Sequence, residues 1–71
     1  MRLTEFHRLV DDEFGRDSSA FLLDTHVLAE FGATPAELLD GGEEPKRVWE
    51  ALCRDFRVPK ERWLGRDEPG S

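Results

Sequence analysis

The sequence is poor in the residues that build β-sheets. It contains no isoleucine and no tyrosine, and its β-branched residues are limited to four valines and three threonines. No stretch of strand length alternates apolar and polar residues, whereas leucine, alanine, glutamate and arginine, which favour helices, are abundant. The composition therefore predicts an all-α fold, a small bundle of three to four short helices followed by a short C-terminal turn and a disordered tail.

Cysteine is almost absent as well. The single cysteine, Cys53, cannot form an internal disulfide, which is typical of a reducing compartment. The N-terminus lacks the apolar core of a signal peptide, and no run approaches the roughly 20 apolar residues of a transmembrane helix. These absences predict a cytoplasmic protein that makes no contact with a membrane.

Apolar residues are scarce for a chain of 71 residues, at 38%, against 37% charged residues. Such a chain forms one domain near the lower size limit for unaided folding, with little stability to spare. A deep substrate pocket would remove a large part of so small a core. We therefore expect a protein that is not an enzyme.

The net charge of −6 is distributed unevenly along the chain. Residues 1–44 carry three basic and eleven acidic side chains, whereas residues 45–71 carry seven basic and five acidic ones. An acidic surface repels nucleic acids and anionic membranes within about a Debye length, roughly 8–10 Å. A partner of the first half is therefore expected to be basic or neutral.

Two helices are predicted in the first half of the chain. Thr4 is a suitable N-cap for the first, and Gly15 is a suitable stop. Ser18 or Ser19 is expected to cap the second, and Gly32 to end it. The apolar stripe of the second helix, which Asp24 interrupts, consists of Ala20, Leu23, Val27, Leu28 and Phe31.

Two further helices are predicted downstream. Thr34, Pro35 and Glu37 form a capping box with proline at the first helical position, and Gly41-Gly42 closes this short helix. The next helix carries the best amphipathic face and is expected to organise the core. That face consists of Pro45, Val48, Trp49, Leu52, Cys53 and Phe56.

The last part of the chain is predicted to leave this helix at Val58-Pro59, because proline disfavours helix in the preceding residue. A final turn from Pro59 to Leu64 would place Trp63 back against the bundle. We expect one domain over residues 1–64 and a flexible tail over residues 65–71.

Three blocks of the sequence resemble a family of small actinobacterial proteins known as domain of unknown function 3046. The blocks are MRLTEFHRLVDDEFG, HVLAEFGATPAELL and VWEALCRDFRVPKERW, and they arrive in the family's order. The match of the first block predicts that Met1 is the natural start. The resemblance implies a small helical cytoplasmic protein encoded near DNA-recombination genes, with no assigned activity. Thr25 precedes His26 where the family pattern has an acid, and Asp24 lies one residue earlier.

The residues capable of metal or acid–base chemistry do not form a recognisable site. His7, His26 and Cys53 come from separate predicted helices and lack the local spacing of zinc ligands. Burial on an apolar stripe raises the pKa of a thiol and makes it inert, which is expected for Cys53. We expect no catalytic residue, no cofactor and no metal. His7 and His26 are expected to be partly buried, hydrogen-bonded histidines, and the sharper alternative is that His26 and Asp24 help fix helix packing through a polar contact.

The remaining functions are binding functions, and a protein partner is favoured. Tryptophan is enriched at interfaces, and Trp63 is a better surface candidate than Trp49, which is expected in the core. The predicted binding surface is Trp63, Leu64, Phe21 and Leu22. Such a protein would serve as an interaction module, for example an adaptor or regulator in DNA metabolism.

A nucleic-acid-binding module with a helix-turn-helix-like arrangement is the alternative. It would use Lys46, Arg47, Arg54 and Lys60, which lie in the basic C-terminal third. Acidic neighbours such as Glu50 reduce the net positive charge of this patch.

Overall fold

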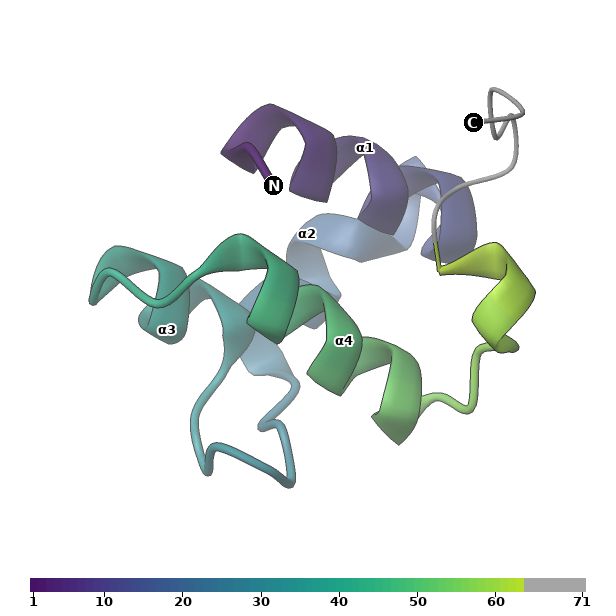
Figure 1. The fold of residues 1–71 in the computed structure, drawn as a ribbon. Coiled ribbons are helices and arrows are strands. Elements are labelled where there is room, and N and C mark those ends of the chain that lie inside the picture. The colour runs from purple at the N-terminus through teal and green to yellow at the C-terminus, as the bar shows by residue number, and fades with distance from the viewer. Residues whose placement is uncertain (64–71) are drawn as a thin grey trace.

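The computed structural model describes residues 1–63, which form four α-helices and one 3-10 turn (Figure 1). The elements are α1 (Leu3–Phe14), α2 (Arg16–Thr25), α3 (Pro35–Asp40), α4 (Pro45–Asp55) and η1 (Lys60–Arg62). The predicted all-α class is confirmed. The predicted end of the domain at Leu64 and the predicted tail over residues 65–71 lie outside the described residues.

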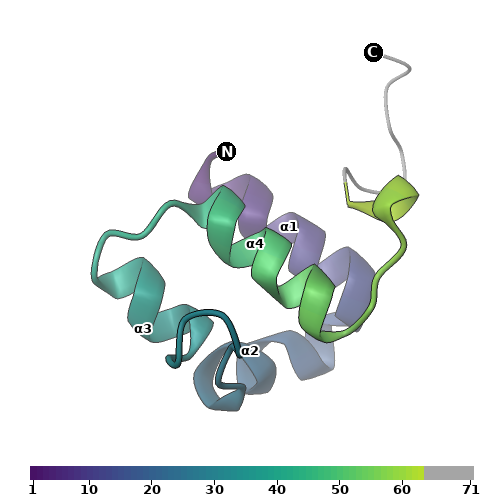
Figure 2. The ribbon, with the colours of Figure 1, turned by 60° about the horizontal axis from the view of Figure 1, so that its bottom comes forward.

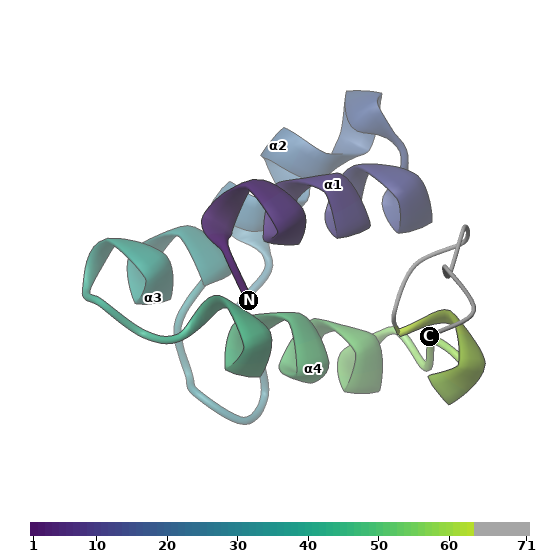
Figure 3. The same cartoon turned by 45° about the horizontal axis from the view of Figure 1, so that its top comes forward.

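The helix pair α1 and α4 forms the centre of the molecule. The two helices lie side by side and run in the same direction (Figures 2 and 3). Helix α2 packs against α1, and α3 joins α2 to α4 at one end of the pair. The core consists of Phe6, Leu9, Val10, Leu23, Leu28, Val48, Trp49, Ala51, Leu52, Cys53 and Val58.

Helix α4 supplies the largest share of this core, as its amphipathic pattern predicts. Trp49 is only 2% exposed, which confirms its expected place in the core. Phe56, expected on the same buried face, is exposed at the C-cap of α4. Its ring instead packs at the surface against the rings of Phe14 and His26.

The predicted starts of the first two helices are wrong. Arg2, not Thr4, occupies the N-cap of α1, without a side-chain hydrogen bond to the helix. Helix α2 begins at Arg16, directly after Gly15, whose positive φ of 92° turns the chain sharply. Ser19 is buried inside α2 and donates a hydrogen bond to Asp11 Oδ1 (2.6 Å). This serine therefore joins α2 to α1 instead of capping a helix.

The predicted end of the second helix at Gly32 is also wrong, because α2 ends at Thr25. The chain then forms a loop in which Leu28 is buried and Val27 is 56% exposed. The Leu28 N–H donates to the Ala33 carbonyl (2.9 Å) and closes the loop upon itself. Val27, Leu28 and Phe31, which continue the helical spacing in the sequence, therefore lie in a loop and not in a helix.

The short helix α3 begins as its capping box predicts. Thr34 Oγ1 accepts a hydrogen bond from the Glu37 N–H (3.2 Å), and Glu37 Oε1 accepts one from the Thr34 N–H (3.1 Å). At the other end, Gly42 has a φ of 94° and donates to the Leu39 carbonyl (3.1 Å). The Glu43 N–H donates to the Leu38 carbonyl (2.9 Å), which completes a Schellman motif.

Helix α4 ends in the same motif but without a glycine. Arg57 has a φ of 57°, and its N–H donates to the Arg54 carbonyl (3.3 Å). The Val58 N–H donates to the Cys53 carbonyl (2.9 Å), so that Val58 turns back into the core. This motif, rather than Pro59 itself, ends the helix.

The segment after α4 returns to the bundle as predicted. The Trp63 indole Nε1 donates to the Val58 carbonyl (2.8 Å), and the Trp49 indole Nε1 donates to the Trp63 carbonyl (2.6 Å). The Arg62 guanidinium donates to both carboxylate oxygens of Glu13 on α1 (2.9 and 3.2 Å). These contacts hold the turn against the ends of α1 and α4.

The two Schellman motifs predict opposite effects of exchanging their positive-φ residues. Gly42→Ala should lower the free energy of unfolding by about 1 kcal/mol, because L-residues are disfavoured in this conformation. A Cβ at Gly42 would meet no atom within 4 Å, so the cost is purely conformational. Arg57→Gly should raise the free energy of unfolding by about 0.5 kcal/mol. Urea denaturation followed by circular dichroism measures both, and shifts of equal sign would contradict this account.

Candidate functional site

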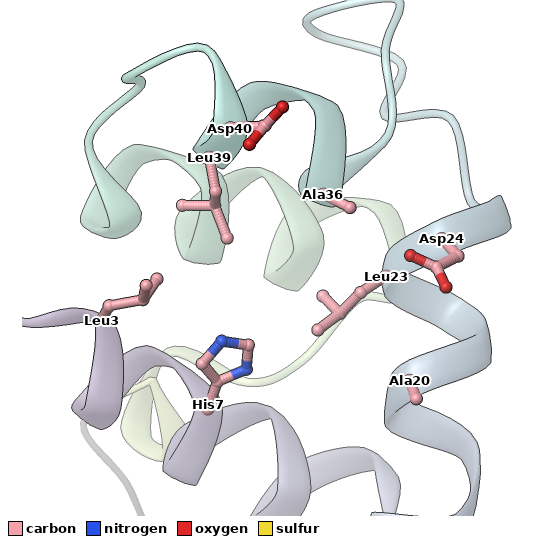
Figure 4. A pocket seen from close by; sticks show the side chains of 8 residues that line it. All are labelled: Leu3, His7, Ala20, Leu23, Asp24, Ala36, Leu39 and Asp40. Carbon is pink, nitrogen blue, oxygen red and sulfur yellow. The ribbon is translucent and has the colours of Figure 1, made fainter.

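The described residues form an open groove between α1, α2 and α3, with a volume of about 390 Å³ (Figure 4). Most of its surface is apolar, and three polar side chains interrupt it. Its lining residues are Leu3, His7, Ala20, Leu23, Asp24, Ala36, Leu39 and Asp40.

Helical spacing explains why these residues meet. In α2 and in α3, the lining residues stand at i, i+3 and i+4, and in α1 at i and i+4. Side chains at these spacings lie on one face of a helix. Ala20 and Ala36 have the shortest side chains of the set, Leu23 lies between them, and Leu3 and Leu39 lie across the groove (Figure 4).

The groove continues from the core to the solvent. Leu23 belongs to the buried core, whereas Leu3 is 48% exposed at the other side of the groove. The imidazole of His7 points into the groove, between the side chains of Leu3, Leu39 and Leu23 (Figure 4). A ligand in the groove would therefore contact leucine side chains and three groups that can form hydrogen bonds, the imidazole of His7 and the carboxylates of Asp24 and Asp40.

The two carboxylates at the groove carry uncompensated charge. Within residues 1–63, neither Asp24 nor Asp40 takes part in a salt bridge or a side-chain hydrogen bond. Many other acidic side chains of the described region are paired. They include Glu5, Asp12, Glu13, Glu30, Glu43, Glu50 and Asp55. The groove is thus an apolar surface with a negative field.

A second polar cluster lies at the far end of α4. Asp55 Oδ2 lies 2.8 Å from His26 Nε2 and accepts a hydrogen bond from the Ala29 N–H (3.1 Å). The predicted contact between His26 and Asp24 is therefore wrong, because α2 ends before His26 and directs its ring toward α4. This carboxylate fixes the loop after α2, and we assign it a structural role.

The amino-acid sequence matches a known protein family. The profile of the family described as "Protein of unknown function (DUF3046)" matches residues 1–61. The chain belongs to the DUF3046 family. The resemblance carried by the three sequence blocks is thereby confirmed.

A curated relative of this DUF3046 chain occurs in Mycobacterium tuberculosis (strain ATCC 25618 / H37Rv). It is named "Putative envelope-preserving system protein Rv2742c" and is 46% identical over 46 residues. The match covers 63% of the DUF3046 chain but only 16% of the relative, so the chain corresponds to a small part of that protein. No solved structure matches the chain.

The residues of the predicted partner surface lie apart in the DUF3046 fold. Phe21 is 70% exposed on α2, whereas Leu22 is half-buried against the core. Consecutive helical residues point about 100° apart, so these two cannot share a face. Trp63 is half-buried beside Trp49 at the end of α4, and Leu64 lies outside the described residues. Among the described residues of this set, Phe21 is thus the exposed apolar side chain.

The basic residues of the alternative surface are largely engaged with neighbours. Arg54 forms an ion pair with Glu30 (2.7 Å) and lies near Glu50 (3.9 Å). Its guanidinium also lies over the Trp63 ring. These pairs neutralise much of the charge that phosphate contacts require.

The other basic residues of this set are distributed along the molecule. Arg47 pairs with Glu43 (3.8 Å) on the preceding turn and lies over the Phe31 ring. Lys60 lies over the ring of Trp63 (5.4 Å from its centroid), and Lys46 is exposed at the start of α4. The structure therefore brings Arg54 and Lys60 together at Trp63 and leaves Lys46 and Arg47 at the other end of α4.

No group of three or more His, Cys, Asp or Glu side chains in the described part of the chain could hold a metal ion. Cys53 is fully buried, and its burial raises the pKa of the thiol to about 12, with a further contribution from the charges of Glu13 and Glu50. This agrees with the expected inert thiol. None of the helices within residues 1–63 is long and apolar enough to cross a bilayer.

The raised pKa of Cys53 predicts slow alkylation. At pH 8, iodoacetamide should modify the folded protein at least about 100-fold more slowly than the urea-unfolded protein, because the thiolate fraction falls tenfold per pKa unit. Above pH 9 the unfolded thiol ionises first, so this group should reduce stability as the pH rises further. Mass spectrometry of timed samples measures the rates. Comparable rates in the two states would show that the thiol is accessible.

The Asp55 cluster predicts a local and a global effect of one substitution. Asp55→Ala should lower the free energy of unfolding by about 2 kcal/mol, because two donors lose a charged acceptor. It should also accelerate hydrogen exchange of the Ala29 amide. Asp12→Ala, at an exposed pair on α1, is the control and should change stability by less than about 1 kcal/mol. An unchanged exchange rate at Ala29 would contradict the role of Asp55.

Proposed function

We propose that this DUF3046 chain is a cytoplasmic protein-interaction module and not an enzyme, and that it binds a partner protein through the groove between α1, α2 and α3. The observation that carries the proposal is the groove itself. The chain has few apolar residues, yet it leaves Leu3, Leu39 and two alanines around an open depression. Covering such a surface by a partner releases water from apolar side chains.

Phe21 fits this proposal as a residue beside the groove. On α2 it lies about 60° around the helix axis from Asp24, which lines the groove. A partner that fills the groove and extends beyond Asp24 would cover the exposed Phe21 ring. The partner surface proposed here thus retains Phe21 and adds residues from α1 and α3.

Trp63 is less suited to a partner than Phe21 is. Its indole N–H and its carbonyl are both used in hydrogen bonds within the fold, and part of its ring is covered. Its contacts hold the C-terminal turn in place. Removal of Trp63 would therefore affect folding before it affected binding.

Two contexts suggest different partners for the proposed module. The family resemblance implies neighbouring genes of DNA recombination, which favours an adaptor or regulator in DNA metabolism. The name of the mycobacterial relative refers to a system that preserves the cell envelope. Both contexts are compatible with a small binding module, and the identity of a captured partner would distinguish them.

Three substitutions on α2 test the position of the binding surface. Ala20→Gln fills the groove with a neutral helix-forming side chain, and we expect it to abolish capture of a protein partner from lysate of the source cells. Phe21→Gln should weaken capture. Ser18→Gln, at an exposed position on another face of α2, should leave capture unchanged. Each variant carries a C-terminal tag, and circular dichroism confirms that each retains its helices.

Quantitative mass spectrometry of nuclease-treated eluates compares the three variants with the natural chain. A partner retained by Ala20→Gln would contradict the groove as the binding surface. Retention of nucleic acid in untreated eluates, with loss of binding at high salt, would instead favour the basic alternative surface.

A further inference from the structure

We infer that the segment of the partner that occupies the groove is a basic amphipathic helix. The inference rests on the proposed function and specifies the chemistry of the ligand. It follows from the shape of the groove, from its charge and from the charge of the surface around it.

The shape of the groove favours a helix over a small molecule. Small-molecule sites enclose most of their ligand, whereas this groove is open to solvent along the gap between three helices. A partner helix laid along it would insert apolar side chains at i and i+3 or i+4 among Leu3, Leu23 and Leu39. The short side chains of Ala20 and Ala36 would let the partner's backbone approach the lining closely.

The charge of the groove determines the sign of the partner. None of the lining residues is lysine or arginine, and the two lining carboxylates are unpaired within residues 1–63. All three helices belong to residues 1–44, which carry eleven acidic and three basic side chains. Lysine or arginine beside the apolar face of a partner helix would meet Asp24 and Asp40. An acidic helix would be repelled.

The same charges argue against a second copy of the chain in the groove. Two copies related by symmetry would bring the carboxylates of Asp24 and Asp40 of each close to those of the other. Like charges that meet at a desolvated interface repel each other and disfavour association. The charges of the groove therefore favour a partner of opposite charge over a second copy of the chain.

Designed peptides test this inference directly. The probe is an amidated peptide of about 16 residues with leucines at i, i+4 and i+7, lysines beside this face and alanines elsewhere. One control peptide replaces lysine by glutamate, and a second contains the same residues in an order that disperses the leucines. Titration into the ¹⁵N-labelled chain is followed by NMR.

We expect the basic amphipathic peptide to shift the amides of α1, α2 and α3 that line the groove, and the two control peptides to bind at least about tenfold more weakly. Asp24→Asn with Asp40→Asn should weaken the basic peptide by about three- to tenfold at low salt. The matched control, Glu44→Gln with Glu61→Gln, removes the same charge from exposed carboxylates outside the groove and should have less than a twofold effect.

Several outcomes would overturn the inference. Equal binding of the glutamate peptide would show that the charge of the partner does not matter. Equal binding of the dispersed peptide would show that an amphipathic face is not required. Equal affinity of both double variants would locate the charge effect outside the groove. A dimer in sedimentation that Ala20→Gln dissociates would make a second copy the occupant. If the basic peptide fails while Ala20→Gln still abolishes partner capture, the helix inference falls and the groove function stands.

Discussion

The packing of α4 against α1 is the interaction on which the rest of the structure depends. Trp49 and its buried neighbours on α4 meet Phe6, Leu9 and Val10 of α1, and every other element is placed against this pair. The turn after α4 is held by the Trp49 indole, and the loop after α2 by Asp55. The chain has few apolar residues, and the core uses most of them. The leucines that remain exposed to solvent around the groove are therefore candidates for binding a partner.

The features predicted correctly from the sequence are those with local causes. The capping box at Thr34 and the glycine stop after α3 depend on residues a few positions apart, and the face of α4 repeats over eleven residues. The end of α2 could not be found in this way. His26 and Ala29 bind a carboxylate that lies 29 and 26 positions downstream, and this contact overrides the helical period.

The groove was missed for a similar reason, since three helices contribute to it. One signal was present in the sequence. Asp24 interrupts the apolar stripe of α2, and such a residue marks a stripe that borders solvent. In the same way, Asp40 follows the apolar residues Ala36 and Leu39 on the groove face of α3. The spacing of Leu3 and His7 gave no comparable signal, because a histidine on an apolar stripe is commonly part of the core.

The contact between Arg62 and Glu13 has a consequence for how the domain can be joined to other sequences. It places the end of the described chain at the carboxyl end of α1, about 15 Å along the helix from Leu3 and the groove (Figure 3). Residue 63, the last described residue, therefore lies at the end of the molecule opposite the groove. A sequence joined before Leu3 would start beside it. Attaching a larger group before Leu3 would therefore crowd the groove, whereas attaching it at residue 63 would place it at the opposite end of the described fold.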